Sequence, residues 1–136
     1  MLRYYAGQRA QFPIVVADSS PSGAADANRR VVEVLQPALA IRYEQYAPEV
    51  HVAQKIASAL EGVPSPYAAL GADDDFSIPA SLERGAAFLA SHPDYAMAHG
   101  EAALFQVIPA AAYGRCLWVA RYPQRAVEGS TGAARL

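Results

Sequence analysis

Cysteine and long apolar runs are scarce in this chain of 136 residues. The single cysteine, Cys116, can form neither an internal disulfide nor a Cys-x-x-Cys zinc site, which suits a reducing compartment. No apolar run approaches the roughly 18 residues of a membrane span, and the N-terminus lacks the pattern of a secretion signal. We therefore expect a cytoplasmic protein without a membrane span.

Charge of either sign is also limited. The chain has 11 basic and 13 acidic residues, a formal net charge of -2, and no block of basic residues that could follow a phosphate backbone. Nucleic acid is therefore not an expected partner. The glycine-rich dinucleotide and Walker motifs, the Gly-x-Ser-x-Gly elbow and the His-Glu-x-x-His zinc motif are absent as well. With 53% hydrophobic and 18% charged residues, the chain is expected to form one globular domain, residues 1–136.

Short apolar segments alternate with segments of helical spacing along the chain. Strands are predicted at 12–17, 38–46, 65–72, 95–107 and 114–123, and helices at 26–36, 49–62 and 78–93. The order β-α-β-α-β-α-β-β favours a three-layer α/β sheet with right-handed crossovers. Large aromatic residues, among them Phe105 and Trp118, are expected in the core.

Three consecutive aspartates, Asp73, Asp74 and Asp75, follow the predicted strand 65–72 in the stretch "LGADDDFSIP". Their like charges repel unless a cation, hydrogen-bond donors or water compensate them. Asp18 also follows a predicted strand, and ligands of open α/β sheets bind beyond the carboxyl ends of the strands. Mg²⁺ or Mn²⁺ takes oxygen ligands, often only one or two from the protein. Alternatively, Asp75 or Ser77 caps the helix that starts near Pro79, and the other aspartates of the run are solvated.

Several of these segments together resemble one family. The strings are "VVADSSPSG", a lysine on the predicted helix 49–62, "VPSPY", "ADDDFSIP" and "FLASHPDYAMAHG", in that order over most of residues 12 to 105. They are similar to the nucleotide-sugar-binding half of family-2-like glycosyltransferases. The resemblance implies a partial GT-A fold, the three-layer α/β/α, Rossmann-like fold of nucleotide-diphospho-sugar transferases.

The resemblance also implies roles for individual residues. Asp73 and Asp75 match the Asp-x-Asp signature, in which Asp75, with Asp73, would hold Mn²⁺ or Mg²⁺ at the donor diphosphate. Asp73 would lie near the ribose or sugar, and Asp74 would also take part in donor binding. Asp18 would lie near the base or ribose, and Lys55 near the base or phosphates. For Lys55, a solvated charge on an amphipathic helix is the alternative. The expected partners are a nucleotide-diphosphate sugar and an unidentified acceptor, which could be a glycan, a lipid or a protein.

The chain also departs from the family pattern at both ends. Family members open with a strand and loop that precede a helix ending like "LRYYAGQ", whereas Met1 lies inside that helix. The acceptor-binding half and the general base follow later in the family, so no catalytic residue is assigned, and the chain is expected to retain at most donor or metal binding. An inactive nucleotide-sugar-binding remnant, a phosphatase of the haloacid dehalogenase type and a nucleotidyltransferase are the alternatives.

Overall fold

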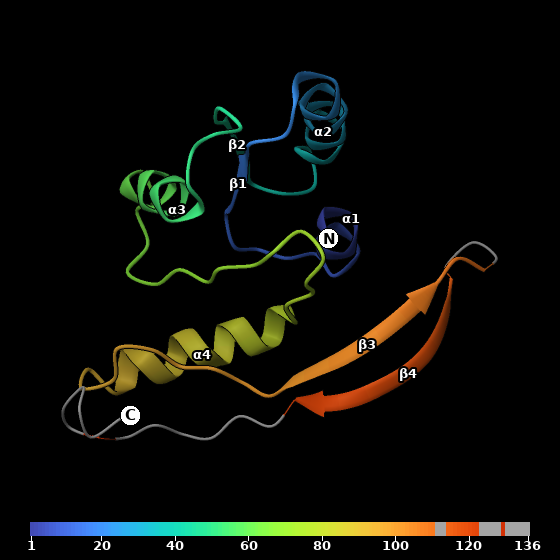
Figure 1. Cartoon of the computed structure of the whole chain (residues 1–136). Coiled ribbons are helices and arrows are strands. Elements are labelled where there is room, and N and C mark those ends of the chain that lie inside the picture. Colours follow the sequence, from blue (N-terminus) through green and yellow to red (C-terminus); the bar gives the residue numbers. More distant parts are fainter. Residues whose placement is uncertain (111–113, 123–128, 130–136) are drawn as a thin grey trace. The chain divides into compact units, whose positions relative to one another are not determined.

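The chain is a mixed α/β protein, as the sequence predicted. The computed structural model describes residues 1–110, 114–122 and 129, and the chain divides into two compact units, Met1–Arg84 and Gly85–Leu136. In chain order the elements are α1 (Leu2–Gly7), β1 (Ile14–Asp18), α2 (Ser22–Leu35), β2 (Ile41–Gln45), α3 (Val52–Glu61), α4 (Pro79–Ser91), β3 (Ala102–Ile108) and β4 (Arg115–Tyr122) (Figure 1).

A β-α-β unit organises the first of the two compact units. β1 and β2 pair in parallel, from Ile14 opposite Ile41 to Asp18 opposite Gln45, and α2 connects them. Figure 1 shows α2 on one side of this strand pair and α3 on the other. Because side chains alternate between the faces of a strand, Asp18 and Gln45 share one face with Tyr43. The carboxyl ends of both strands therefore meet at one edge, between two helices.

Helix α2 covers the strand pair with small and β-branched residues. Ala25 and Val32 are its buried residues, two turns apart on one face. The helix begins at Ser22, directly after Pro21, and so starts earlier than the predicted segment 26–36. Ala24 and Ala25 donate to the Pro21 carbonyl in this first turn, which extends the helix toward β1. The loop between β1 and α2 is thereby only three residues long.

A small hydrophobic core lies beneath α1. Tyr5, Ala10 and Leu39 are buried there, and the Tyr5 ring meets Phe12 edge to face with centroids 5.6 Å apart. The surrounding, partly buried residues are Met1, Tyr4, Ala6, Phe12, Ile14, Leu35 and Ile41. Helix α1 thus anchors the start of the chain on the amino end of the strand pair.

The strand predicted at 65–72 is wrong. Those residues contain no strand, and neither of the two sheets in the described ranges includes them. Small residues, Ala68, Ala69, Gly71 and Ala72, bury little surface on either face, and Leu70 is 69% exposed. A strand also needs a backbone partner, and none of the described residues provides one. The observed order is α-β-α-β-α-α-β-β, with two two-stranded sheets in place of the predicted single sheet.

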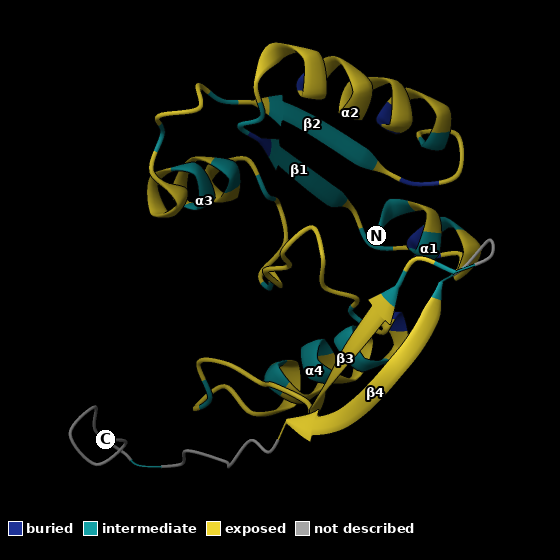
Figure 2. Cartoon of the chain, turned by 45° about the vertical axis from the view of Figure 1, so that its right-hand side comes forward, coloured by how far each residue is buried: buried dark blue, intermediate teal, exposed yellow. Residues whose placement is uncertain are grey.

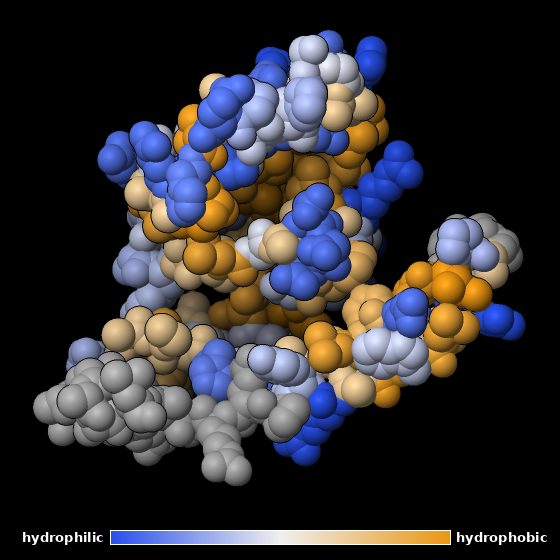
Figure 3. Space-filling model, viewed as in Figure 1, coloured by the Kyte–Doolittle hydropathy of each residue, from blue (hydrophilic) through white to orange (hydrophobic). Residues whose placement is uncertain are grey.

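The second unit contains an antiparallel hairpin of β3 and β4, with a register shift between Gln106 and Val107. β3 begins only at Ala102, although the predicted strand began at 95. Figure 2 shows both strands exposed along almost their whole length, and Figure 3 shows hydrophobic side chains gathered over them. Phe105 is 48% and Trp118 47% exposed, so the prediction that they belong to a core is wrong in this structure.

Arg42 of β2 fixes the end of α3. Its guanidinium donates to the carbonyls of Ala59 at 2.7 Å and Gly62 at 2.8 Å, which are among the last acceptors of the helix. Its Nε lies 3.0 Å from a carboxylate oxygen of Glu44, an ion pair without hydrogen-bond alignment. Gly62 is the C-cap, as predicted, but its φ of -97° is not left-handed. A Cβ there would meet the Arg42 guanidinium, the flexible end of a side chain, which would have to move aside.

We expect Arg42→Ala to lower the free energy of unfolding by about 1 kcal/mol, because two carbonyls at the end of α3 lose their donor. Urea unfolding followed by circular dichroism measures this change. Arg42→Lys is the matched control: it keeps the charge but cannot reach both carbonyls with one forked group, so it should recover only part of the loss. An unchanged midpoint in Arg42→Ala would show that water replaces the guanidinium without cost.

Candidate functional site

Asp18 is the centre of a polar cluster at the carboxyl end of β1. Its side chain is the buried charged group of the first unit, with 8% of the residue exposed. Oδ1 accepts a hydrogen bond of 2.7 Å from the Ser20 backbone amide, which closes a turn in the loop after the strand. Oδ2 accepts from Asn28 Nδ2 at 2.9 Å and from the Tyr43 hydroxyl at 2.7 Å. The carboxylate therefore joins the loop, α2 and β2.

A second layer of contacts holds Tyr43 in place. The Arg29 guanidinium lies over the Tyr43 ring, 5.2 Å from its centroid, and donates to the Gln45 side chain at 2.8 Å. Asn28 and Arg29 follow each other on α2, so one turn of that helix supplies both contacts. The strand register places Tyr43 and Gln45 near Asp18. Gln45 lies opposite Asp18, and Tyr43 lies two residues before Gln45 on the same face of β2.

This environment changes the acidity of two groups in opposite directions. Burial alone would raise the pKa of the Asp18 carboxyl, but the hydrogen bonds from Ser20, Asn28 and Tyr43 outweigh it and hold that pKa well below its usual range. Burial and the hydrogen bond to the Asp18 carboxylate raise the pKa of Tyr43 to about 12. Asp18 is thus ionised, and Tyr43 protonated, over the whole physiological range.

The two shifts predict stability that falls at both ends of the pH scale. A depressed carboxyl pKa stabilises the folded state above its ordinary value of 3.8, and this stabilisation is lost as the pH falls below about 4. A raised tyrosine pKa stabilises below its ordinary value of 10.0, and this is lost as the pH rises toward about 12. Urea midpoints measured across pH should show both declines.

Two variants separate these groups from all others that titrate. Asp18→Asn should flatten the decline of stability in acid relative to the unaltered chain, and Tyr43→Phe should flatten the decline in alkali. Tyr43→Phe should also lower the free energy of unfolding at neutral pH by about 1 kcal/mol. Identical pH profiles for the variants and the unaltered chain would contradict this assignment.

Lys55 joins the cluster from the other helix. Its Nζ donates to Ser19 Oγ at 2.9 Å, and the lysine is half-buried on α3. Ser19 directly follows Asp18, so the same loop is held by α2 through the carboxylate and by α3 through the lysine. The predicted site residues Asp18 and Lys55 therefore both contact the loop after β1. Asp18 accepts a hydrogen bond from Ser20, and Lys55 donates one to Ser19.

The three aspartates lie in an exposed turn. Asp73, Asp74 and Asp75 are all exposed, and the Asp75 amide donates to the Ala72 carbonyl at 3.2 Å. The next residues contact α1: the Ser77 amide donates to the Tyr5 hydroxyl at 3.3 Å, and Phe76 meets the Tyr4 ring edge to face at 5.4 Å. The two tyrosines of α1 therefore position the end of the aspartate run on the first unit.

The aspartate run offers chemistry that fits a hard cation, although it does not enclose one. No group of three or more histidine, cysteine, aspartate or glutamate side chains converges in the described part of the chain. A Mg²⁺ or Mn²⁺ ion that also binds substrate phosphates needs only one or two protein carboxylates, and exposed aspartates supply them. That Asp75 and Asp73 hold such an ion stays a prediction from the sequence.

Sequence reasoning missed most of the hydrogen-bonding partners of Asp18. Its partners Asn28 and Tyr43, and Arg29 over the Tyr43 ring, carry no recognisable motif, and their role depends on how α2 packs across the strands. No local signal identifies them, because the parallel register that places Gln45 level with Asp18 is known only from the fold.

Comparisons with models of protein families, with curated proteins and with solved structures found no match to this chain. Each helix in the described ranges is too short or too polar to cross a lipid bilayer.

Proposed function

We propose that this chain binds a nucleotide-diphosphate sugar and belongs to a metal-dependent glycosyltransferase of the GT-A type. The observation that carries the proposal is the convergence of Asp18, Ser19 and Lys55, from β1, its loop and α3, at the carboxyl end of a parallel strand pair. Ligands of α/β sheets bind at this edge. The three-layer GT-A arrangement, of which β1, β2 and their two helices would be a part, is included in the proposal.

The contacts suggest different tasks for the two charged residues. Asp18 already accepts three hydrogen bonds, so its first task is to shape the loop, and one remaining lone pair on Oδ1 is left for a ribose or base donor. Lys55 spends one of its three N–H donors on Ser19, which leaves two for phosphate oxygens. Asp73 and Asp74 would lie along the sugar side of the donor, and Asp75 at its diphosphate.

Sugar transfer requires that the negative charge growing on the leaving diphosphate be stabilised. A divalent cation would offset the negative charge that grows on the leaving diphosphate. Asp75 and Asp73 would hold that cation, and Lys55 would add a positive charge from the protein. An inverting reaction also needs a general base near the acceptor hydroxyl. Glu101 is paired with Arg121 in the hairpin, and Glu128 lies outside the described residues, so neither is assigned.

Isothermal titration of UDP and of GDP into the purified chain, with and without Mn²⁺, tests the proposal. We expect saturable binding of at least one nucleotide that strengthens in the presence of Mn²⁺. The absence of binding by both, in a chain whose circular dichroism shows folded helices, would refute it. Incubation with UDP-sugars and GDP-sugars then separates an active enzyme, which releases the nucleotide, from a binding remnant, which does not.

A further inference from the structure

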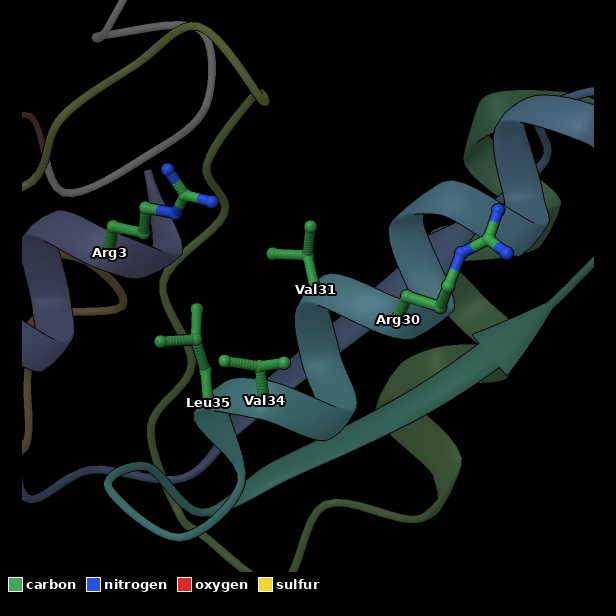
Figure 4. A pocket seen from close by; sticks show the side chains of 5 residues that line it. All are labelled: Arg3, Arg30, Val31, Val34 and Leu35. Atoms are coloured by element: carbon green, nitrogen blue, oxygen red, sulfur yellow. The ribbon is translucent and has the colours of Figure 1, made fainter.

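A cavity of about 200 Å³ lies between α1 and α2, and its lining does not include Asp18. It is lined by Arg3, Arg30, Val31, Val34 and Leu35. Figure 4 shows Arg3 projecting from α1, with Val31 and Leu35 extending from α2 on the side where Arg3 lies. The lining therefore combines two guanidinium groups with three aliphatic side chains and contains no carboxylate.

The aliphatic part of this lining is left open to water. Val31 is 37% and Val34 77% exposed, whereas Val32 and Ala25 of the same helix are buried. Two exposed valines on neighbouring turns form an apolar strip beside α1. Covering such a strip is favourable by about 25 cal/mol for each Å² of apolar surface removed from water. A ligand with an aliphatic portion would gain from binding here.

The two arginines define the charge of that ligand. Both side chains are exposed, and within the described ranges neither makes a hydrogen bond or an ion pair. A guanidinium presents a planar fork of donors that matches the two oxygens of a carboxylate or phosphate. Two unpaired positive charges on a lining without acidic groups complement an anion and repel a cation.

We propose that this cavity binds an amphiphilic anion, a molecule with a carboxylate or phosphate head and a short aliphatic chain. The head would contact either Arg3 or Arg30, which lie at opposite ends of the lining, and the chain would cover the aliphatic side chains Val31, Val34 and Leu35 between them (Figure 4). A volume of about 200 Å³ has room for the head group and a few carbons, and the rest of a longer chain would lie over the exposed Val34. This site is separate from the Asp18 cluster and does not depend on the proposed function.

Titrations with four probes test the proposal by amide chemical shifts of the isotope-labelled chain. Octanoate and octyl phosphate carry both parts, octanol lacks the charge, and inorganic phosphate lacks the chain; all are kept below the concentration at which they form micelles. We expect saturable shifts at Val31 and Val34 with at least one of the two amphiphiles, and binding at least fivefold weaker with octanol and with inorganic phosphate. Saturation by octanoate alone or by octyl phosphate alone identifies the head group.

Variants assign the two parts of the site. At least one of Arg3→Ala and Arg30→Ala should weaken binding of the amphiphile about fivefold, as expected for an exposed ionic contact, and the weaker variant identifies the arginine that holds the head. Val34→Ser should weaken it as well without unfolding the chain, since that side chain is mostly exposed. Arg84→Ala, an arginine on α4 that contacts Ser81, is the control and should bind as before. The proposal is overturned by equal binding of octanol, by equal binding of inorganic phosphate, by no saturable binding, or by full affinity in both arginine variants.

Discussion

Replacement of Asp18 by alanine should lower the free energy of unfolding by about 3 kcal/mol. Three donors lose their acceptor at once: the Ser20 amide, the Asn28 amide group and the Tyr43 hydroxyl. A hydrogen bond to a charged group contributes about 1.5 to 3 kcal/mol, and contacts that share one carboxylate do not add fully. Urea unfolding at neutral pH, followed by far-ultraviolet circular dichroism, measures the change.

Two further variants make this result specific to the buried carboxylate. Asp26→Ala removes an exposed aspartate from α2 and should change the free energy of unfolding by less than about 0.5 kcal/mol. Asp18→Asn keeps the size of the side chain but loses the charge and one acceptor, so its effect should lie between the two. If Asp18→Ala matched Asp26→Ala, the network around Asp18 would have no energetic role, and the loop after β1 would have to be held by other contacts.

Substitution of Asp18 should also weaken nucleotide binding at the proposed ligand site. Ser19 and Ser20 form the loop that Lys55 contacts, and the Asp18 carboxylate closes the turn at Ser20. Without that turn the loop can adopt more conformations, and ordering it on binding lowers the affinity. A folded Asp18→Asn chain should therefore bind nucleotide more weakly than the unaltered chain, even though the position of Lys55 on α3 is unchanged.

The elements that the sequence predicted well are those with a local signal. Strand β1 combines β-branched residues with the turn formers that follow it, and β2 shows alternation before Pro48. Helices α3 and α4 have regular apolar spacing with Gly62 and Pro79 at their ends. These features depend on neighbouring residues alone, which is why they could be found without knowledge of the tertiary structure.

The elements that failed depend on partners distant in sequence. Residues 65–72 satisfy a strand pattern only if another strand pairs with them, and no described strand does. Phe105 and Trp118 would be core residues if a helix or a second sheet covered the hairpin. A two-stranded hairpin has no interior of its own, so the same side chains remain exposed. Apolar character predicts that a residue gains from burial; it does not supply the surface that buries it.

The residues of the candidate site also fall into those with a local sequence signal and those that depend on the fold. Asp18 was found because it ends a strand, and Lys55 because it matches a family position on a helix. Their convergence on one loop follows from the packing of α3 beside β1, which spacing along the chain does not reveal. Tyr43 and Arg29 were missed because each becomes informative only when the strand register and the turn of α2 are known.

Asp75→Ala should weaken the Mn²⁺-dependent binding of UDP or GDP about ten- to hundredfold. This range corresponds to a charged contact of about 1.5 to 3 kcal/mol converted at 1.4 kcal/mol for each factor of ten. The side chain is exposed and no described residue forms a salt bridge with it, so its loss should leave the fold intact. Isothermal titration with and without Mn²⁺, with the unfolding midpoint recorded for each variant, measures both effects.

The dependence on metal distinguishes a cation site from a general loss of negative charge. Without Mn²⁺, the removal of an aspartate should leave nucleotide binding unchanged or strengthen it slightly, because a carboxylate repels the diphosphate. Asp94→Ala, an exposed aspartate in the second unit, should bind as the unaltered chain does. Asp74→Ala should have a smaller effect than Asp75→Ala, since the Asp-x-Asp pattern assigns the cation to the outer two residues. Equal Mn²⁺ dependence in Asp75→Ala and Asp94→Ala would exclude Asp75 as a metal ligand, and any donor binding would then have to be assigned to Lys55 and the loop after β1.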